Sequence, residues 1–260
     1  MTIRFASARL KLKRAQRHIA ELKESIHRFL NENPHSFEIK KDADGNFGIS
    51  ALPGREVPAE FSPIIGDAFH NLRSALDHLA AELVRMNGHR PTRYTGFPMG
   101  DTKASFDGYV AEKLKGASNV MLAIVRAVEP YERKTVGNYG DGVELEWLSH
   151  MDIKDKHLLL LTTVGVATLK DVRVIFEGQV RASFGSLQVS GNDRVNVATF
   201  AGFGDDVHLE ADPNATLEIR FKDTPHFQNE PVVHVLERML TKVAIVIDRF
   251  ERTLFPSSCY

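Results

Sequence analysis

The stretch Gly66-Asp-Ala-Phe-His-Asn-Leu-Arg-Ser-Ala-Leu-Asp-His-Leu79 lies in a segment whose apolar residues recur every three or four positions. This period predicts an amphipathic helix from about residue 63 to residue 86, because residues at that spacing share one face of a helix. Its apolar stripe consists of Ile65, Ala68, Phe69, Leu72, Leu76, Leu79, Leu83 and Met86. The Asn87-Gly88 pair that follows is typical of the end of a helix.

Six polar residues are crowded between positions 70 and 78 of the same helix. At about 100° per residue they fall on two sides of the apolar stripe. One flank carries His70, Arg73 and Asp77, and the other side carries Asn71, Ser74 and His78. Asn, His, Ser and Asp are poor helix formers, so their number indicates that they are there for hydrogen bonding.

The remaining sequence predicts more helices and a region of strands. The helical period recurs in segments 5–30, 118–128, 143–161 and 231–254, with a shorter helix at 106–115. Two short alternating runs around Asp44-Gly45 predict a hairpin over residues 36–51. Between residues 164 and 222 the period changes to two, which predicts an antiparallel sheet of about five strands.

Together these elements predict an α+β protein. We expect a helical bundle over residues 1–162 that includes the hairpin 36–51. An antiparallel β subdomain over residues 163–228 is inserted before the C-terminal helix. Residues 229–260 then pack back on the bundle.

Composition excludes several classes of protein. The 260 residues carry 33 Lys and Arg against 34 Asp and Glu, which excludes a globally basic nucleic-acid packer. The one cysteine, Cys259, excludes a disulfide framework and a thiolate metal site. No apolar run reaches the ~20 residues of a membrane span, and the N-terminus lacks the apolar core of a signal peptide. We therefore expect a cytoplasmic protein without membrane contact.

The neutral total hides a basic N-terminal segment. Residues 1–30 hold eight Lys and Arg against two Glu, a local charge of +6 (8 − 2). Such a helix is typical of a nucleic-acid footprint, and it is equally typical of a solvated face balanced by acidic residues elsewhere. The sequence leaves both interpretations open.

The predicted helix 143–161 carries a second polar group. Asp155 lies in the middle of its apolar face, where an unpaired carboxylate would be costly. We therefore expect Asp155 to pair with Arg73 or His78. His150 and His157 lie on an adjacent flank and could line the same cleft.

Two interpretations of these polar residues follow from the residues themselves. One is a structural network of ion pairs that fixes the helix register, in a non-catalytic protein that binds a partner protein. The other is a metal-dependent hydrolase whose ligands would be His70, Asp77, His78, His150 and His157, although no established metal-binding spacing is present.

A third interpretation comes from a resemblance. The element Arg73-Ser-Ala-Leu-Asp-His78 resembles the Arg–(four to six residues)–His motif of the HEPN superfamily, within a helical context similar to that of the family. The wider stretch, together with Asp155–His157, also resembles a family of uncharacterised bacterial proteins.

The HEPN resemblance implies a metal-independent endoribonuclease, or an RNA-binding toxin-like protein, that needs no cofactor. His78 would act as general acid and base, and Arg73 would hold the phosphate. The two point about 140° apart on an ideal helix, so a homodimer would have to bring the motifs together. The supporting residues would be His70, Asn71, Asp77, His150, Asp155 and His157.

Overall fold

The computed structural model describes residues 4–32, 37–41, 43, 47–51, 56–131, 142–157, 163–176, 179–190, 196–200, 207–210, 216–222, 224 and 226–256. The chain divides into two compact units. The helical unit comprises Met1–Leu22, Ser62–Leu161 and Val233–Tyr260, and the strand-rich unit comprises Lys23–Phe61 and Thr162–Val232.

The helices lie where the sequence predicts them, within a few residues. They are α1 (Ala6–Glu32), α2 (Phe61–Met86), α3 (Lys103–Lys113), α4 (Asn119–Arg126), α5 (Val143–His157) and α6 (Val232–Leu254). No helix in the part of the chain that the structure describes is long and apolar enough to cross a bilayer. The helical prediction is therefore confirmed.

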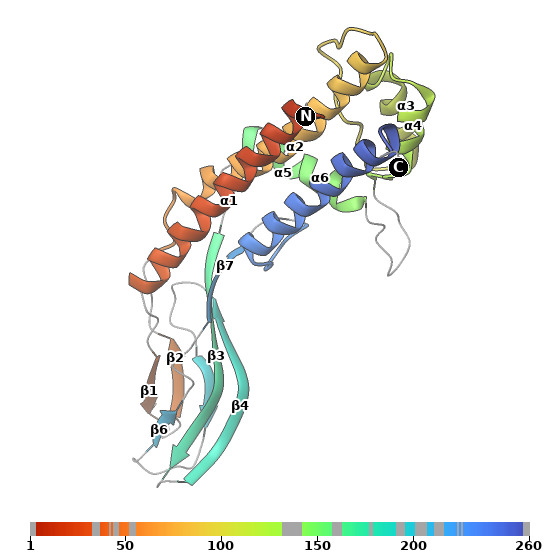
Figure 1. The fold of residues 1–260 in the computed structure, drawn as a ribbon. Helices are drawn as coiled ribbons and strands as arrows, with labels where there is room; N and C mark the ends of the chain where they lie inside the picture. Colours follow the sequence, from red (N-terminus) through yellow and green to blue (C-terminus); the bar gives the residue numbers. More distant parts are fainter. Residues whose placement is uncertain are drawn as a thin grey trace. The chain divides into compact units, whose positions relative to one another are not determined.

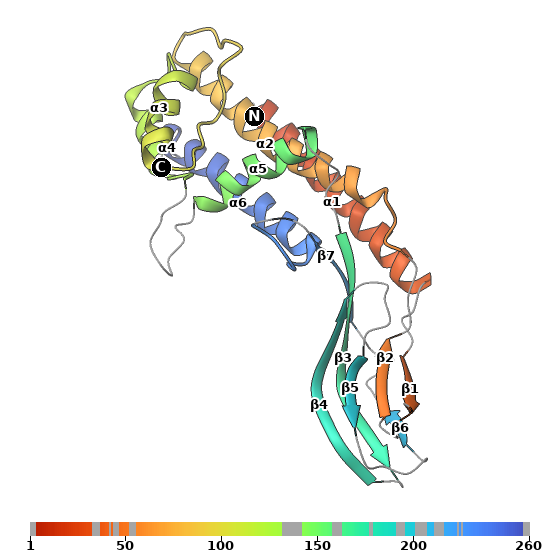
Figure 2. The same cartoon turned by 180° about the vertical axis from the view of Figure 1, so that it is seen from behind.

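The core of the helical unit is built from the predicted apolar stripes. α1 and α2 run antiparallel and lie side by side in both Figure 1 and Figure 2. The α2 stripe is fully buried from Ile65 to Leu83, and its outer end at Met86 is exposed. Large side chains of α6, such as Ile247 and Phe250, are also fully buried. Burial of an apolar side chain of this size stabilises the fold by about 1.5–3 kcal/mol.

Polar contacts fix where α1 begins. Glu82 of α2 accepts hydrogen bonds from the backbone N–H of Ser7 at 3.0 Å and of Ala8 at 3.3 Å, and from the Ser7 hydroxyl. The first N–H groups of a helix have no partner within the helix, so this carboxylate takes the role of a cap. On another side of α1, Arg9 pairs with Asp248 at 2.8 Å and with Glu251, which joins α1 to α6.

The strand-rich unit contains two sets of antiparallel strands. β1 (Phe37–Lys41), β2 (Phe47–Ala51) and β5 (Asn196–Phe200) pair in the order β1-β2-β5. In the second set the long strand β3 (Thr163–Phe176) pairs with β4 (Gln179–Ser190). β3 also pairs with β7 (Thr216–Phe221) over its first half and with β6 (Val207–Glu210) over its second half.

The hairpin differs from the prediction that placed it in the bundle. β1 and β2 belong to the strand-rich unit, because β2 pairs along Phe47–Ser50 with β5, from a distant part of the sequence. A free strand edge presents unpaired N–H and C=O groups and readily takes up another strand. The alternating pattern of residues 47–51 predicts a strand but contains no information on its second partner.

Candidate functional site

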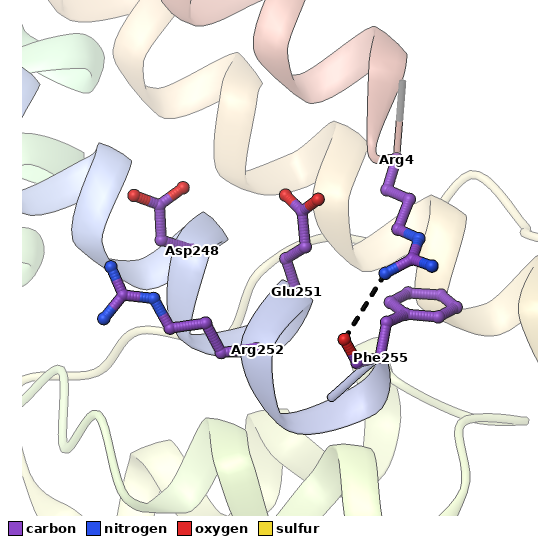
Figure 3. A pocket seen from close by; sticks show the side chains of 5 residues that line it. All are labelled: Arg4, Asp248, Glu251, Arg252 and Phe255. Carbon is purple, nitrogen blue, oxygen red and sulfur yellow. Dashed lines mark hydrogen bonds between the residues drawn. The ribbon is translucent and has the colours of Figure 1, made fainter. Parts of the chain in front are cut away.

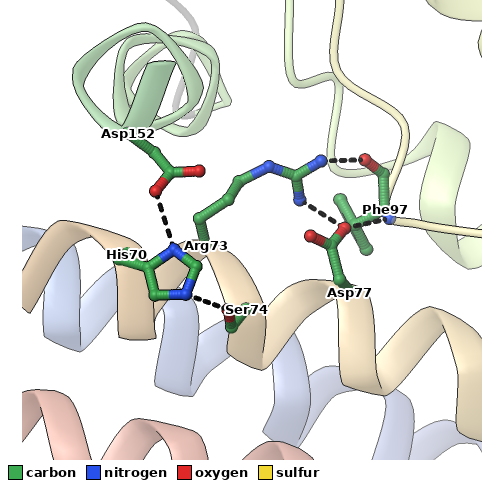
Figure 4. A network of polar contacts seen from close by, with 6 residues as sticks. All are labelled: His70, Arg73, Ser74, Asp77, Phe97 and Asp152. Atoms are coloured by element: carbon green, nitrogen blue, oxygen red, sulfur yellow. Dashed lines mark hydrogen bonds and ion pairs between the residues drawn. The ribbon is translucent and has the colours of Figure 1, made fainter. Parts of the chain in front are cut away.

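The polar flank of α2 faces two other segments of the helical unit. Figure 4 shows His70 directed toward Asp152 of α5, and Arg73 and Asp77 directed toward the segment at Phe97. The three α2 residues follow one another at i, i+3 and i+7, so they share one side of the helix as predicted.

Arg73 and Asp77 form a clamp with Phe97. Arg73 Nη1 lies 2.8 Å from Asp77 Oδ1, and Arg73 Nη2 donates to the Phe97 carbonyl oxygen at 3.0 Å. Asp77 Oδ1 also accepts from the Phe97 backbone N–H at 2.9 Å. The Arg73 side chain is only 11% exposed, so its charge is held by groups of the same chain. We call the contacts among these three residues the Arg73 clamp.

Gly96 allows the clamp to close. A Cβ atom at this position would lie 2.9 Å from Asp77 Oδ1, closer than a carbon normally approaches an oxygen. That oxygen is already held by Arg73 and by the Phe97 N–H, so it has little freedom to move away. The segment at residues 96–97 is therefore packed tightly against α2.

His70 joins α2 to α5. Its Nδ1 lies 3.0 Å from Asp152 Oδ1, and its Nε2 lies 3.4 Å from the Ser74 hydroxyl. A neutral ring that donates from Nδ1 to the carboxylate can accept at Nε2 from the hydroxyl, so both contacts are satisfied by one tautomer. Asp152 is buried and the His70 ring is 40% exposed. The bond therefore fixes the position of α5 against α2.

The expected pairing of Asp155 falls outside the described side chains, as does the position of His157. Among the described side chains, Arg73 pairs with Asp77, and Asp152 is a carboxylate of α5 that contacts α2. The sequence does carry a signal for Asp152, because it follows the fully buried Leu148 by one helical turn.

Asn71 and His78 do not join this network. Asn71 Nδ2 donates to the carbonyl oxygen of Asp67, one turn earlier in the same helix. His78 is partly exposed, and no hydrogen bond or ion pair joins it to Arg73 among the described residues. The two residues of the Arg–His element thus diverge within one chain, as their spacing on a helix predicts.

The metal set expected from the sequence is not assembled within the described part of the chain. His70 pairs with Asp152 and Asp77 pairs with Arg73. His150 Nε2 lies 2.8 Å from Glu146 Oε1, its neighbour one turn earlier on α5, and 3.7 Å from Asp101 Oδ1. The potential ligands are therefore divided among separate contacts.

Lys113 of α3 interacts electrostatically with Arg73 and Asp77, which its position in the sequence does not indicate. Burial lowers the pKa of Lys113 below its ordinary value of 10.5, Arg73 lowers this pKa further, and Asp77 and Glu112 partly offset both effects. Lys113 Nζ also lies 5.0 Å from the centre of the Tyr109 ring, a cation–π distance.

The exposed face of α1 is basic. Residues 4–20 contain six Lys and Arg and no acidic residue. Lys13, Arg14 and Arg17 are exposed on this face, and Lys11 is partly exposed beside it. Among the residues that the structure describes, none of these four forms an ion pair, in contrast to Arg9. We call Lys13, Arg14 and Arg17 the basic face.

A pocket of about 350 Å³ lies where α1 begins and α6 ends (Figure 3). It is lined by Arg4, Asp248, Glu251, Arg252 and Phe255. The Arg4 guanidinium lies 4.0 Å from the centre of the Phe255 ring and donates to the Phe255 carbonyl oxygen at 3.4 Å. Both carboxylates also pair with Arg9, so three guanidinium groups meet two carboxylates, a net charge of +1 (3 − 2).

Comparison with known proteins gives no match: no protein-family model, no curated protein and no solved structure is similar to the chain.

Proposed function

We propose that the protein binds RNA through the basic face of α1, and that the Arg73 clamp serves the fold. The observation that carries the proposal is the row of exposed, unneutralised Lys13, Arg14 and Arg17 on one side of a long helix, among the residues described. Lys and Arg that neutralise phosphates supply most of the affinity of a sequence-independent nucleic-acid contact.

The surroundings of α1 favour a polyanion over a membrane surface. A helix that lies in a bilayer interface inserts its apolar side among the lipids. The apolar side of α1 is occupied within the protein, because Ala8, Ala15, Ile19 and Leu22 are buried. Leu10 is exposed, but it is a single apolar side chain beside three charged ones, so α1 offers a partner a mainly charged side. The resemblance of Arg73–His78 to the HEPN motif makes RNA the polyanion to test first.

Burial supports the structural role of Arg73. An arginine that holds a substrate phosphate needs an open approach and free N–H groups. Arg73 is 9% exposed and has both an acidic and a carbonyl partner within the chain. In this proposal it takes no part in RNA contact within a single chain.

Binding of a fluorescent single-stranded RNA, measured at several salt concentrations, tests the proposal. The triple variant Lys13→Gln, Arg14→Gln, Arg17→Gln should bind at least ~10-fold more weakly. The slope of log K against log salt should fall by about 2, at ~0.7 per lost phosphate contact. The matched control removes three exposed arginines elsewhere: Arg85→Gln, Arg90→Gln, Arg93→Gln. An equal loss of RNA affinity in both triple variants would show that the loss depends only on the net charge of the protein, and this would contradict the proposal.

Metal-independent RNA cleavage by His78 is the second candidate, and one observation favours it. The contact between Ser7 and Glu82 sets the level of the antiparallel helices. Lys11 lies four residues after Ser7 on α1, and His78 lies four residues before Glu82 on α2. Because the two helices run antiparallel, His78 therefore lies at the same level as the basic residue Lys11. Incubating the same RNA with protein in EDTA, beside His78→Ala, tests this candidate. Loss of cleavage in the variant with unchanged binding would support it, whereas no cleavage by the unaltered protein would leave binding as the function.

A further inference from the structure

Three side chains that are distant in the sequence converge in the helical unit. Glu146 and His150 are one turn apart on α5, and Asp101 directly precedes Thr102, the N-cap of α3. One carboxylate oxygen of each acid and one imidazole nitrogen of His150 all lie within 4.8 Å of one another. This convergence is separate from the Arg73 clamp and from the basic face, and it shares only His150 with the metal set expected from the sequence.

The spacing of the three ligand atoms is close to that of a metal site. His150 Nε2 lies 2.8 Å from Glu146 Oε1 and 3.7 Å from Asp101 Oδ1. Ligands about 2.0–2.2 Å from one zinc ion stand roughly 3–3.5 Å from each other in a tetrahedral site. The contact between His150 and Glu146 is that of a hydrogen-bonded pair and would open slightly to admit an ion, and Asp101 would move closer to His150.

Two of the three side chains are held on fixed backbone. Glu146 is 3% exposed on α5, where its position is set by the packing of the helix. Asp101 lies between Gly100, whose N–H donates to the Pro130 carbonyl oxygen at 3.2 Å, and Thr102, the N-cap of α3. A Cβ at Gly100 would lie 2.6 Å from Ser105 Oγ, so this residue must remain a glycine for the segment to approach α3.

Charge and exposure fit a divalent ion. Two carboxylates and a neutral imidazole carry a charge of −2, which a divalent cation neutralises. Glu146 is 3% exposed, so its carboxylate would lie on the inner side of the ion. The Asp101 side chain is 80% exposed, so the outer side of the site is open to water. Imidazole suits zinc and similar transition metals, whereas Mg²⁺ and Ca²⁺ prefer oxygen ligands alone.

We propose that Asp101, Glu146 and His150 bind one divalent transition-metal ion of the zinc class, with water completing its coordination. This inference does not depend on RNA binding, since none of the three residues belongs to the basic face.

Calorimetric titration of the EDTA-treated and dialysed protein with Zn²⁺ tests the inference. We expect one equivalent of Zn²⁺ to bind, with an affinity at least ~10-fold lower in Asp101→Asn and in His150→Ala. The control Asp107→Asn alters another partly exposed aspartate of the same region and should bind Zn²⁺ as the unaltered protein does. An excess of Mg²⁺ should not compete.

Thermal unfolding gives a second measurement. Zn²⁺ should raise the midpoint of unfolding in the unaltered protein and in Asp107→Asn, and less in Asp101→Asn, because a ligand stabilises the state that binds it. Absence of binding by the unaltered protein would overturn the inference. Equal affinities of the unaltered protein and both ligand variants would also overturn it, because the zinc would then bind at other histidines.

Discussion

Arg73 on α2 and Arg17 on α1 carry the same charged group in opposite surroundings. Arg73 is 9% exposed and is held by Asp77 and the Phe97 carbonyl, whereas Arg17 is exposed and forms no ion pair within the described chain. A buried guanidinium loses its hydration and needs partners in its own chain. The charge of an exposed guanidinium remains available to attract a partner molecule. The comparison shows that surroundings, rather than residue type, decide whether an arginine is held within its own chain or remains available to a partner.

Removing Arg73 gives the largest expected effect. Arg73→Ala should lower the free energy of unfolding by about 1–3 kcal/mol, because it removes the guanidinium partner of the partly buried Asp77 carboxylate and of the Phe97 carbonyl. Arg17→Ala should change it by less than about 0.5 kcal/mol. Urea unfolding measures both. A loss under about 1 kcal/mol in Arg73→Ala, together with lost RNA binding, would reverse the roles assigned to the two residues.

Glu82 connects the two regions, because it lies on α2 and caps the first turn of α1. Glu82→Ala should cost about 0.5–2 kcal/mol, the range for loss of a helix cap. Thermal or urea unfolding measures this cost, with the exposed Glu24→Ala as control. If the two variants were equally stable, the carboxylate would not fix the start of α1, and the basic face would be less rigidly placed than the structure indicates.

Lys113 gives the smallest effect, and the size of this effect depends on pH. Its pKa is lowered in the folded protein, chiefly by burial, so the unfolded chain binds the proton more tightly. Stability should therefore rise with pH as Lys113 loses its proton, up to its ordinary value of 10.5, and below the folded pKa the charge is a constant cost.

The variant Lys113→Met removes the titrating group and keeps most of the aliphatic chain. Its stability should lack this alkaline rise when urea midpoints are compared between pH 7 and pH 10. A parallel pH dependence in the two proteins would show that Lys113 is fully hydrated, and would remove it from the surroundings of the Arg73 clamp.

The helices could be predicted from the sequence because their apolar residues are local and periodic. The stripe of α2 is buried as expected, and His70, Arg73 and Asp77 share one flank. The partners of these residues were not predictable in the same way. The sequence analysis did not single out Asp152, which lies one helical turn after Leu148. It singled out Asp155, because Asp155 also lies among apolar residues of the same helix.

Contacts between distant segments carry no periodic signal. Nothing in the spacing of residues 96–101 indicates that Phe97 meets Arg73, or that Asp101 meets His150. Both contacts depend on the path of an irregular segment across the helices. The same limit explains the hairpin, whose second strand finds its partner in β5.

The close packing of Gly96 against Asp77 has a consequence for how this sequence can change. Any side chain at position 96 would press on the Asp77 carboxylate that holds Arg73. A substitution there would therefore act on Arg73 through Asp77, which lies one turn further along α2. Positions 73, 77 and 96 therefore form one mutational unit. A change at any of them is best tolerated when the others change with it, even though the chain separates the glycine from the two charges.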